Sequence, residues 1–255
     1  MKSFLLFAIL IVAIPVEAQN HYYTTTFPLT ENPICENAGA GCVWLNGKTT
    51  GLNWGNVQTI PGMATGTIVN GAPPYNDSSA VVNGTWTTNQ TVQATVKINS
   101  SPTDGSSQEE VELRLNTTIT PNSITGYEAD ASVLAGNVYL VWARWNGPLN
   151  SYCYIHNGTC DSSPTIAAVQ VHNGDVLTAT NVNGQLTMYL NGVAETTAFD
   201  TTFTGGYPGM GFWNIGGTAA DLLNYGLSKF TAWDSAYTGV KPGAPTNVAG
   251  KWVIK

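Results

Sequence analysis

From Glu110 to Leu115, apolar and charged side chains alternate along the chain. The apolar set is Val111, Leu113 and Leu115, and the charged set is Glu110, Glu112 and Arg114. A period of two places these sets on opposite faces of a β-strand. Charged residues make up only 10% of the chain, and Arg114 is one of its two arginines. The charged face of this strand therefore either forms internal ion pairs or presents a polar surface to a partner.

The same period recurs along most of the chain, with turn residues between the apolar runs. Strands are expected at residues 91–98, 109–116, 125–133, 137–145, 152–155, 166–171, 205–213 and 226–233. The clearest hairpin joins 175–181 to 185–190 through Asn183-Gly184, a pair that tolerates positive φ in a tight turn. Residues 20–77 are expected to supply edge strands and loops at one end. Helical periodicity is nearly absent, so we predict an all-β fold, a two-sheet antiparallel jelly-roll sandwich.

The N-terminus has the features of a secretory signal. An apolar run from Phe4 to Ile14 follows the positively charged start, and Val16 and Ala18 occupy the −3 and −1 positions of a cleavage site. The run is shorter than the roughly 20 apolar residues that a bilayer span needs. We therefore expect a secreted or cell-surface product. Its expected segments are a signal at 1–18, a β-domain at 19–234 and a Pro/Gly-rich tail at 235–255.

Charge and cysteines narrow the choice of partners and compartment. A net charge of −7 makes nucleic acid and anionic membranes poor partners. The four cysteines form two pairs of equal spacing, Cys35 with Cys42 and Cys153 with Cys160. Secretion permits disulfides, and the two local pairings are favoured among the three connectivities because each loop contains turn residues. A metal site is the alternative, although no histidine spacing supports it. The sequence gives no oligomeric state.

Two late motifs resemble a known superfamily. The hairpin contains Gly174-Asp175-Val176-Leu177 and Asn183-Gly184-Gln185-Leu186-Thr187-Met188-Tyr189-Leu190-Asn191-Gly192, and Tyr207-Pro208-Gly209-Met210-Gly211-Phe212 follows. These segments resemble the late strands of LamG-like jelly rolls in the concanavalin A-like lectin/glucanase superfamily. The resemblance covers residues 75–234 and is best from His172 onward. It implies a jelly roll with a concave sheet that often contacts glycans, in a superfamily that contains both enzymes and binding modules.

If residues 109–116, 124–133 and 137–145 form a meander, their charged side chains can meet on one sheet face. The candidate ligand-binding residues are Glu112, Arg114, Glu128, Trp142 and Arg144. Planar polar groups can take sugar hydroxyls, and Trp142 offers a ring to the C–H face of a sugar. The alternative is a structural lattice of ion pairs. We favour a non-catalytic carbohydrate-binding or cell-surface adhesion module with a polysaccharide or glycan as its partner.

Two other function classes stay open, and no catalytic residue is assigned. A polysaccharide-cleaving enzyme could use the same concave face. However, residues 110–114 lack the central Asp and the last Glu of the glucanase pattern Glu-x-Asp-x-Glu. Glu112-Leu113-Arg114 and Gln170-Val171-His172 look like two alginate-lyase strands, but Glu110 stands where those lyases have an arginine. The third class is a structural component of the extracellular matrix.

Calcium is the one cofactor that the resemblance suggests, since these jelly rolls often hold it through loop carboxylates and carbonyls. The loop or strand-end acids that could serve are Asp77, Asp161, Asp200, Asp221 and Asp234. No contiguous loop signature selects among them, so no ligand is assigned.

Overall fold

The computed structural model describes residues 21–36, 41–68, 77–100, 109–148, 151–156, 158–214 and 221–242. The expected signal segment and most of the expected tail lie outside these residues. The last strand ends at Asp234. In the described part of the chain, no helix has the length and apolar character needed to cross a membrane.

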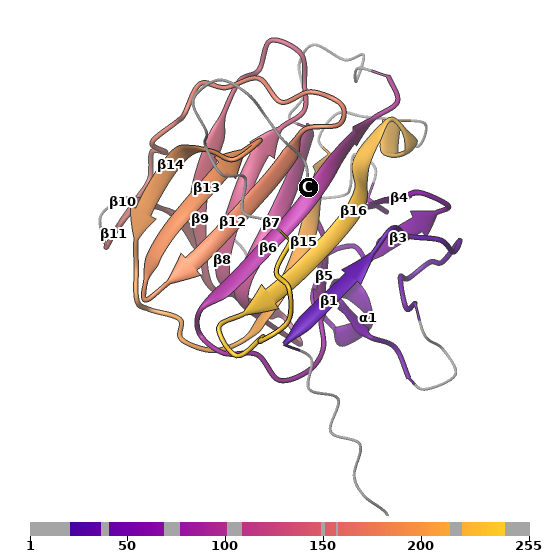
Figure 1. Cartoon of the computed structure of the whole chain (residues 1–255), viewed down its shortest axis with the longest axis horizontal. Helices are drawn as coiled ribbons and strands as arrows, with labels where there is room; N and C mark the ends of the chain where they lie inside the picture. The colour runs from indigo at the N-terminus through magenta and orange to yellow at the C-terminus, as the bar shows by residue number, and fades with distance from the viewer. Residues whose placement is uncertain are drawn as a thin grey trace, which may run out of the picture.

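Most described elements are β-strands, and they form two antiparallel sheets that lie face to face (Figure 1). Sheet A has the order β14-β13-β12-β6-β16-β4-β3, with β1 also paired to β16. Its strands are β1 (Tyr22–Thr25), β3 (Val57–Ile60), β4 (Met63–Gly66), β6 (Gln90–Ile98), β12 (Val176–Val182), β13 (Gln185–Leu190), β14 (Val193–Phe199) and β16 (Tyr225–Asp234). A short 3-10 helix, η1 (Asp221–Leu223), precedes β16.

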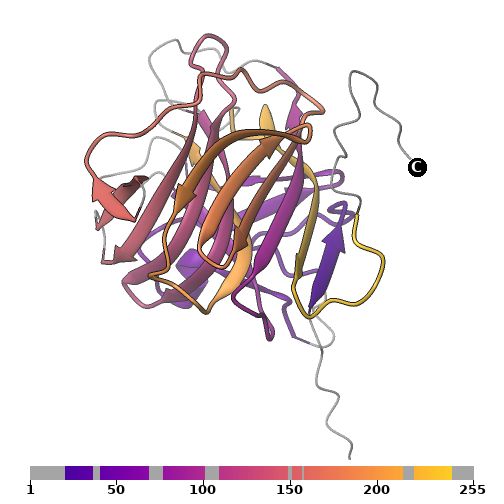
Figure 2. The same ribbon diagram turned by 60° about the vertical axis from the view of Figure 1, so that its left-hand side comes forward.

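Sheet B has the order β11-β10-β9-β8-β7-β15-β5-β2. Its strands are β2 (Trp44–Asn46), β5 (Asp77–Val82), β7 (Glu109–Thr120), β8 (Ser123–Ser132), β9 (Leu140–Gly147), β10 (Tyr152–His156), β11 (Thr159–Asp161) and β15 (Tyr207–Asn214). Figure 2 shows the two layers after a turn of 60° that brings the left-hand side of Figure 1 forward. The two-sheet antiparallel sandwich predicted from the sequence is confirmed.

The main core lies between the sheets and follows the period of two. In β7, Val111, Leu113 and Leu115 are fully buried and belong to one apolar cluster with residues of sheet A such as Val92 and Leu177. The intervening side chains of β7 therefore point away from sheet A. We call the side of sheet B that faces away from sheet A its outer face.

Turn chemistry accounts for the hairpins and for one missed strand. Asn183 and Gly184 both have positive φ, as the tight turn between β12 and β13 requires. Asn191 and Gly192 repeat this conformation and lead into β14, which the sequence analysis did not predict. The expected strand at 166–171 is wrong, because that segment forms only an isolated bridge between Ala167 and Leu140.

The N-terminal part supplies edge strands to both sheets, as expected: β3 ends sheet A and β2 ends sheet B. The helix α1 (Gly47–Thr50) and the loop after it lie against the outer face of sheet B. A second apolar cluster forms there from Leu52, Trp54, Val81, Ile119, Ile124 and Trp145. One end of the outer face is therefore covered.

Both predicted disulfides are present. Cys35 bonds to Cys42 in the segment between β1 and β2, and Cys153 of β10 bonds to Cys160 of β11. Each bond joins two cysteines that are seven residues apart in the sequence, so both crosslinks are local.

Candidate functional site

The outer face of sheet B gathers five carboxyl groups around one guanidinium group. This acid cluster consists of Asp77, Glu110, Glu112, Glu128 and Asp130, and it surrounds Arg114. The strand register sets Glu112 beside Asp130 and Arg114 beside Glu128, across β7 and β8. Trp213 of β15 stands between the cluster members of β5 and those of β7. No member of the cluster is more than 8% exposed.

Arg114 is held on several sides. Its guanidinium forms ion pairs with Glu112 and with Glu128. Glu128 also accepts a hydrogen bond of 2.7 Å from the indole N–H of Trp145. Above the guanidinium, the ring of Trp54 lies 5.1 Å from the Arg114 Cζ, a cation–π distance. Arg114 is fully buried, so it forms the floor of the cluster and not its accessible surface.

A glycine in β15 makes room for this ion pair. Gly211 is registered with Glu112 on one side and with Ser79 on the other. A Cβ atom at this position would collide with the Glu112 Oε2 and would lie 2.8 Å from the Arg114 Nη2. The Gly209-Met210-Gly211 motif of the sequence therefore has a local role, because a larger residue here would displace the cluster.

Burial controls the protonation of the cluster. It raises the pKa of the Glu110, Glu112 and Asp130 carboxyls well above the usual range, and repulsion from neighbouring carboxyls adds to the effect. Burial and repulsion from Glu128 raise the pKa of Asp77 to about 7, although Arg114 and a hydrogen bond with Glu112 oppose the shift. Several carboxyl groups of the cluster therefore hold their protons at mildly acidic pH.

Some cluster members share these protons. Hydrogen bonds link the Asp77 carboxyl to Glu112 and the Asp130 carboxyl to Glu128. A bond between two carboxyl groups needs a proton on one of them, since an ionised carboxylate only accepts. Arg114 stays charged, because its carboxylate neighbours raise its pKa although burial alone would lower it. The site thus holds proton donors and proton acceptors close together.

An aromatic border lies beside the acid cluster and reaches solvent. It consists of Tyr139, Trp145, Tyr152, Tyr154 and Trp213. The Trp145 and Tyr152 ring centroids are 5.0 Å apart, and those of Tyr152 and Tyr154 are 5.8 Å apart. Tyr152 is 46% exposed, and Trp213 is half-buried. The outer face therefore offers apolar rings beside a polar floor.

Two tyrosines connect this border to the acids. The Tyr139 hydroxyl donates a hydrogen bond to Glu110, and burial together with this carboxyl raises the pKa of Tyr139. Burial also raises the pKa of Tyr154, with smaller effects from Tyr152, Asp130 and Glu110. The carboxyl groups of the acid cluster therefore influence the pKa values of Tyr139 and Tyr154 in the aromatic border.

The prediction that Trp142 and Arg144 share this face is wrong. The register pairs Arg144 with Tyr127, a core residue, so both side chains lie on the side of sheet B that faces sheet A. Trp142 is 3% exposed within the main core. The residue of β9 that joins the acid cluster is Trp145. The period of two was correct in each strand, but the relative register of β8 and β9 was not readable from the sequence.

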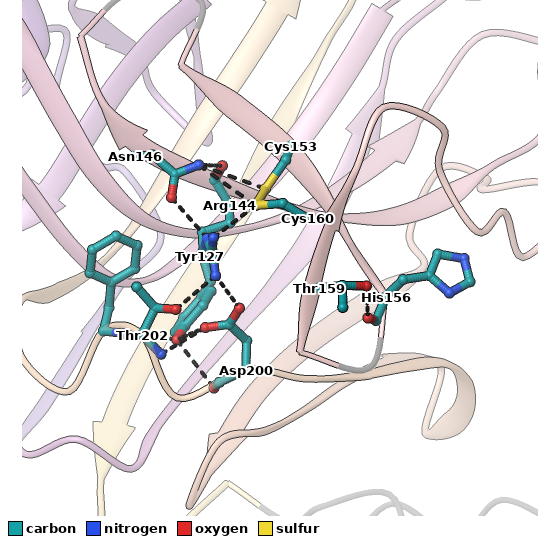
Figure 3. A network of polar contacts seen from close by, with 10 residues as sticks. Tyr127, Arg144, Asn146, Cys153, His156, Thr159, Cys160, Asp200 and Thr202 are labelled. Atoms are coloured by element: carbon teal, nitrogen blue, oxygen red, sulfur yellow. Dashed lines mark hydrogen bonds and ion pairs between the residues drawn. A yellow bond between two sulfur atoms is a disulfide. The ribbon is translucent and has the colours of Figure 1, made fainter.

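Arg144 forms a separate network at the edge of the sandwich (Figure 3). Its guanidinium contacts the Asp200 carboxylate at 2.5 Å and the Thr202 hydroxyl at 2.7 Å. Its other nitrogens contact the Asn146 side-chain oxygen at 2.8 Å and the Cys160 Sγ at 2.7 Å. This network joins the Cys153–Cys160 hairpin to the loop after β14, and we interpret it as structural.

Of the five predicted ligand-binding residues, the structure brings together Glu112, Arg114 and Glu128. All three are buried, which corresponds to the structural lattice that the sequence left open. Sequence reasoning missed Asp77, Tyr139 and Trp213 as neighbours of these charges. Asp77 lies next to the part of the chain that has the least regular pattern. The sequence around Trp213 predicts a strand but does not indicate on which face of the sheet Trp213 lies.

The acid cluster is not suited to calcium. Carboxylate oxygens of Glu112, Glu128 and Asp130 lie within 4.8 Å of one another. Arg114 already binds two of these three groups, and calcium prefers six to eight oxygen ligands without a neighbouring cation. Two of the proposed loop acids are also occupied by protein partners: Asp200 by Arg144, and Asp234 by His21 at 2.8 Å. The side chain of Asp221 lies outside the described residues.

No protein-family model and no curated protein sequence matches the chain. Solved structures match it at the level of the fold. The exoplasmic/lumenal domain of VIP36, in a Ca²⁺/mannose-bound form, has a TM-score of 0.52 at 10% identity and covers 88% of this chain and 93% of its own. A prokaryotic β-1,3-1,4-glucanase (lichenase) derived from a mouse hindgut metagenome has a TM-score of 0.50 at 11% identity, covering 84% and 98%.

The carbohydrate recognition domain of Emp46p, crystallised as a point mutant, has a TM-score of 0.50 at 13% identity and covers 83% of this chain and 98% of its own. At such low identities the likeness concerns architecture alone. It confirms the fold that the late hairpin and the Gly209-Met210-Gly211 strand predicted: the chain folds as a concanavalin A-like jelly roll.

Proposed function

We propose that this protein is a secreted carbohydrate-binding or cell-surface adhesion module whose site is the outer face of sheet B. The observation that supports it best is the aromatic border beside the acid cluster. Sugars present hydroxyl groups to polar side chains and C–H faces to aromatic rings. The buried ion pairs of Arg114 with Glu112 and Glu128 form the floor of the site, while the half-buried Trp213 and Tyr154 offer rings to a ligand.

The structural neighbours favour the same class of ligand. They include a mannose-bound lumenal domain, a carbohydrate recognition domain and a glucanase. A glycan is therefore the first ligand to test. Calcium, which accompanies mannose in one of these neighbours, is included as a test addition, although the acid cluster itself does not fit it.

The test is binding of the intact protein to a panel of polysaccharides and oligosaccharides, followed by calorimetry on the best ligand. Trp213→Ala is expected to weaken binding by about tenfold or more, because a stacking ring is lost. The control is Tyr237→Ala, which removes a ring that stacks on Tyr22 beside sheet A at 4.6 Å. That variant is expected to bind like the wild type.

If Tyr237→Ala loses binding and Trp213→Ala keeps it, the site lies on sheet A. Absence of binding to every glycan would overturn the proposal and would favour a structural matrix component.

A second candidate function is glycan cleavage, which the carboxyl groups of the acid cluster favour. Glycosidases need one protonated carboxyl as an acid and a second carboxyl group about 5 Å or more away. The acid cluster contains several carboxyl groups that keep their protons, but the hydrogen-bonded Asp130 and Glu128 are too close together to be that pair, so the partner of Asp130 would be another member of the cluster. Release of reducing ends, lost in Asp130→Asn, would support a hydrolase, whereas unsaturated products that absorb in the ultraviolet would indicate a lyase. Binding without any product supports the non-catalytic module.

Secretion and the segment boundaries belong to the same proposal. Two disulfides are compatible with an oxidising compartment. After expression in a secreting host, the protein recovered from the culture medium is expected to begin at residue 19, as measured by mass spectrometry. A product that retains residues 1–18 would contradict the signal assignment.

A further inference from the structure

We propose that the glycan bound by the outer face of sheet B carries free amino groups, as in a deacetylated amino-sugar polymer. This inference rests on the proposed function and specifies its ligand class. Three observations lead to it: the charge imbalance of the acid cluster, the unpartnered polar atoms within it, and the position of the aromatic rings.

The charge imbalance is the first observation. Five carboxyl groups face a single guanidinium, and all are at least nine-tenths buried. The other described lysines and arginine lie elsewhere: Lys97 and Lys229 are on sheet A, Arg144 pairs with Asp200, and Lys48 in α1 and Lys241 after β16 are exposed. Burying an uncompensated charge is costly. The cluster therefore has to hold extra protons or accept a cation from a ligand.

Unpartnered atoms are the second observation. The Asp130 Oδ1 and the Ser79 Oγ are both buried and have no hydrogen-bond partner in the described structure. Ser79 lies on β5 opposite Gly211, so its hydroxyl faces across the missing side chain toward Glu112. An ammonium group offers three donors and needs acceptors. The Arg114 Nε is a third buried polar atom without a hydrogen-bond partner in the described structure.

The aromatic border is the third observation. Trp213 stands between Asp77 and Glu110 in the strand register. A ring in this position can stack on a sugar and attract an ammonium group to its face. A uronate polymer would meet repulsion from the ionised carboxyls, and a neutral glycan would supply no cation in place of the protons that the cluster otherwise holds. An amino sugar offers a C–H face to the aromatic rings and an ammonium group to the carboxyl groups.

The experiment compares three hexasaccharides of the same length by calorimetry at pH 6: glucosamine, N-acetylglucosamine and glucose, each β-1,4-linked. The wild type is expected to bind the glucosamine hexamer at least about tenfold more tightly than the other two. Glu110→Gln and Asp130→Asn are expected to remove most of this preference. Glu195→Gln, on β14 of sheet A, is the charge-matched control and is expected to preserve it.

The outcomes separate the two proposals. Equal affinity for all three hexamers would overturn the amino-sugar inference and leave glycan binding intact. If the protein binds none of the three hexamers and no glycan of the wider panel, both proposals are overturned. A lysine hexamer that binds as tightly as the glucosamine hexamer would show simple charge attraction and would also overturn the inference. A preference that survives in both acid variants but not in Glu195→Gln would place the charged subsite on sheet A.

Discussion

The two arginines of this chain have different electrostatic surroundings. Arg144 has one carboxylate partner, Asp200, and all three guanidinium nitrogens make contacts. Arg114 faces five carboxyl groups, and its Nε has no partner in the described structure. The first group is balanced and complete without a ligand. The second is unbalanced, so it must keep protons or take up a cation. The candidate site therefore differs from the scaffold in its excess of carboxyl groups over cations, and not merely in containing charged residues.

The pKa directions follow the same division. Burial alone would raise the pKa of Asp200, but hydrogen bonds from the Thr202 N–H and the Tyr127 hydroxyl, with Arg144 nearby, lower it. In the acid cluster the donors Arg114, Tyr139 and Trp145 are shared among five carboxyl groups, and burial raises the pKa of Asp77 to about 7. The two regions should therefore respond to pH in opposite directions and to mutation by different amounts.

The largest difference is expected when each arginine is removed. Arg114→Met leaves Glu112 and Glu128 buried without their counter-charge, which should lower the free energy of unfolding by about 3–5 kcal/mol at pH 7. Arg144→Met should cost about 1–3 kcal/mol, because Asp200 keeps its bonds to Thr202 and Tyr127. Urea unfolding of both variants measures the comparison. Equal losses would show that the imbalance around Arg114 has no energetic consequence.

The pH dependence of stability is the second test. The folded pKa of Asp77 is raised from 3.8 to about 7, so its stabilising contribution is full below pH 4 and is lost as the pH rises toward 7. The size should be on the order of 2–4 kcal/mol. Thermal unfolding should therefore show a lower Tm at pH 8 than at pH 5, and Asp77→Asn should reduce that difference.

Asp200 supplies the opposite sign. Its folded pKa is lowered, so its contribution is present above its unfolded pKa of about 4 and is lost as the pH falls through the folded value. Asp200→Asn should change stability at neutral pH but leave the decline between pH 5 and 8 in place. A Tm that rises from pH 5 to pH 8 would contradict the raised carboxyl pKa values.

A glycine substitution probes the space around the ion pair. Gly211→Ala forces a methyl group against Glu112 and Arg114, and overpacking of this kind should cost about 1–3 kcal/mol. Gly205→Ala is the matched control, because a Cβ there meets nothing within 4 Å. It should change the free energy of unfolding by less than about 0.5 kcal/mol. Similar values for the two variants would mean that the cluster tolerates displacement.

Comparatively small effects are expected from variants that remove one hydrogen bond to Asp200 or one to Glu128. Tyr127→Phe removes a 2.8 Å bond to Asp200 and leaves the Phe203 N–H without its acceptor, so it should cost about 1–2 kcal/mol. Trp145→Phe removes the bond to Glu128 and also leaves space where the larger indole packs against Trp54 and Tyr152, so it should cost about 1–3 kcal/mol. Chemical unfolding can resolve these values. No measurable loss for Trp145→Phe would show that Glu128 is held by Arg114 without the indole.

Much of the architecture was predictable from local pattern. Alternation in 110–115, the Asn183-Gly184 turn and the equal cysteine spacings led to the correct strand, hairpin and disulfides. These features depend on residues close together in the chain. The missed strand β14 is explained in the same way, since Asn191-Gly192 was interpreted as a strand end although it forms a second hairpin turn.

The candidate site was only partly predictable. Glu112, Arg114 and Glu128 were correctly grouped because they alternate within β7 and β8. Trp142 and Arg144 were grouped with them wrongly, since a shift of one residue in the pairing of β8 and β9 exchanges the two faces of β9. Trp145 then takes the place on the outer face.

Local pattern was enough to predict that this chain forms β-strands with acids and a base on one side of β7, and that Asn183-Gly184 closes one hairpin. Contacts in the folded chain set which strands stand next to one another, bring Asp77 to the acids of β7 and β8, and place Trp54 over Arg114. The physical reason is that a period of two fixes faces within one strand. Register and burial, which fix the charge balance, arise from contacts between residues far apart in the chain.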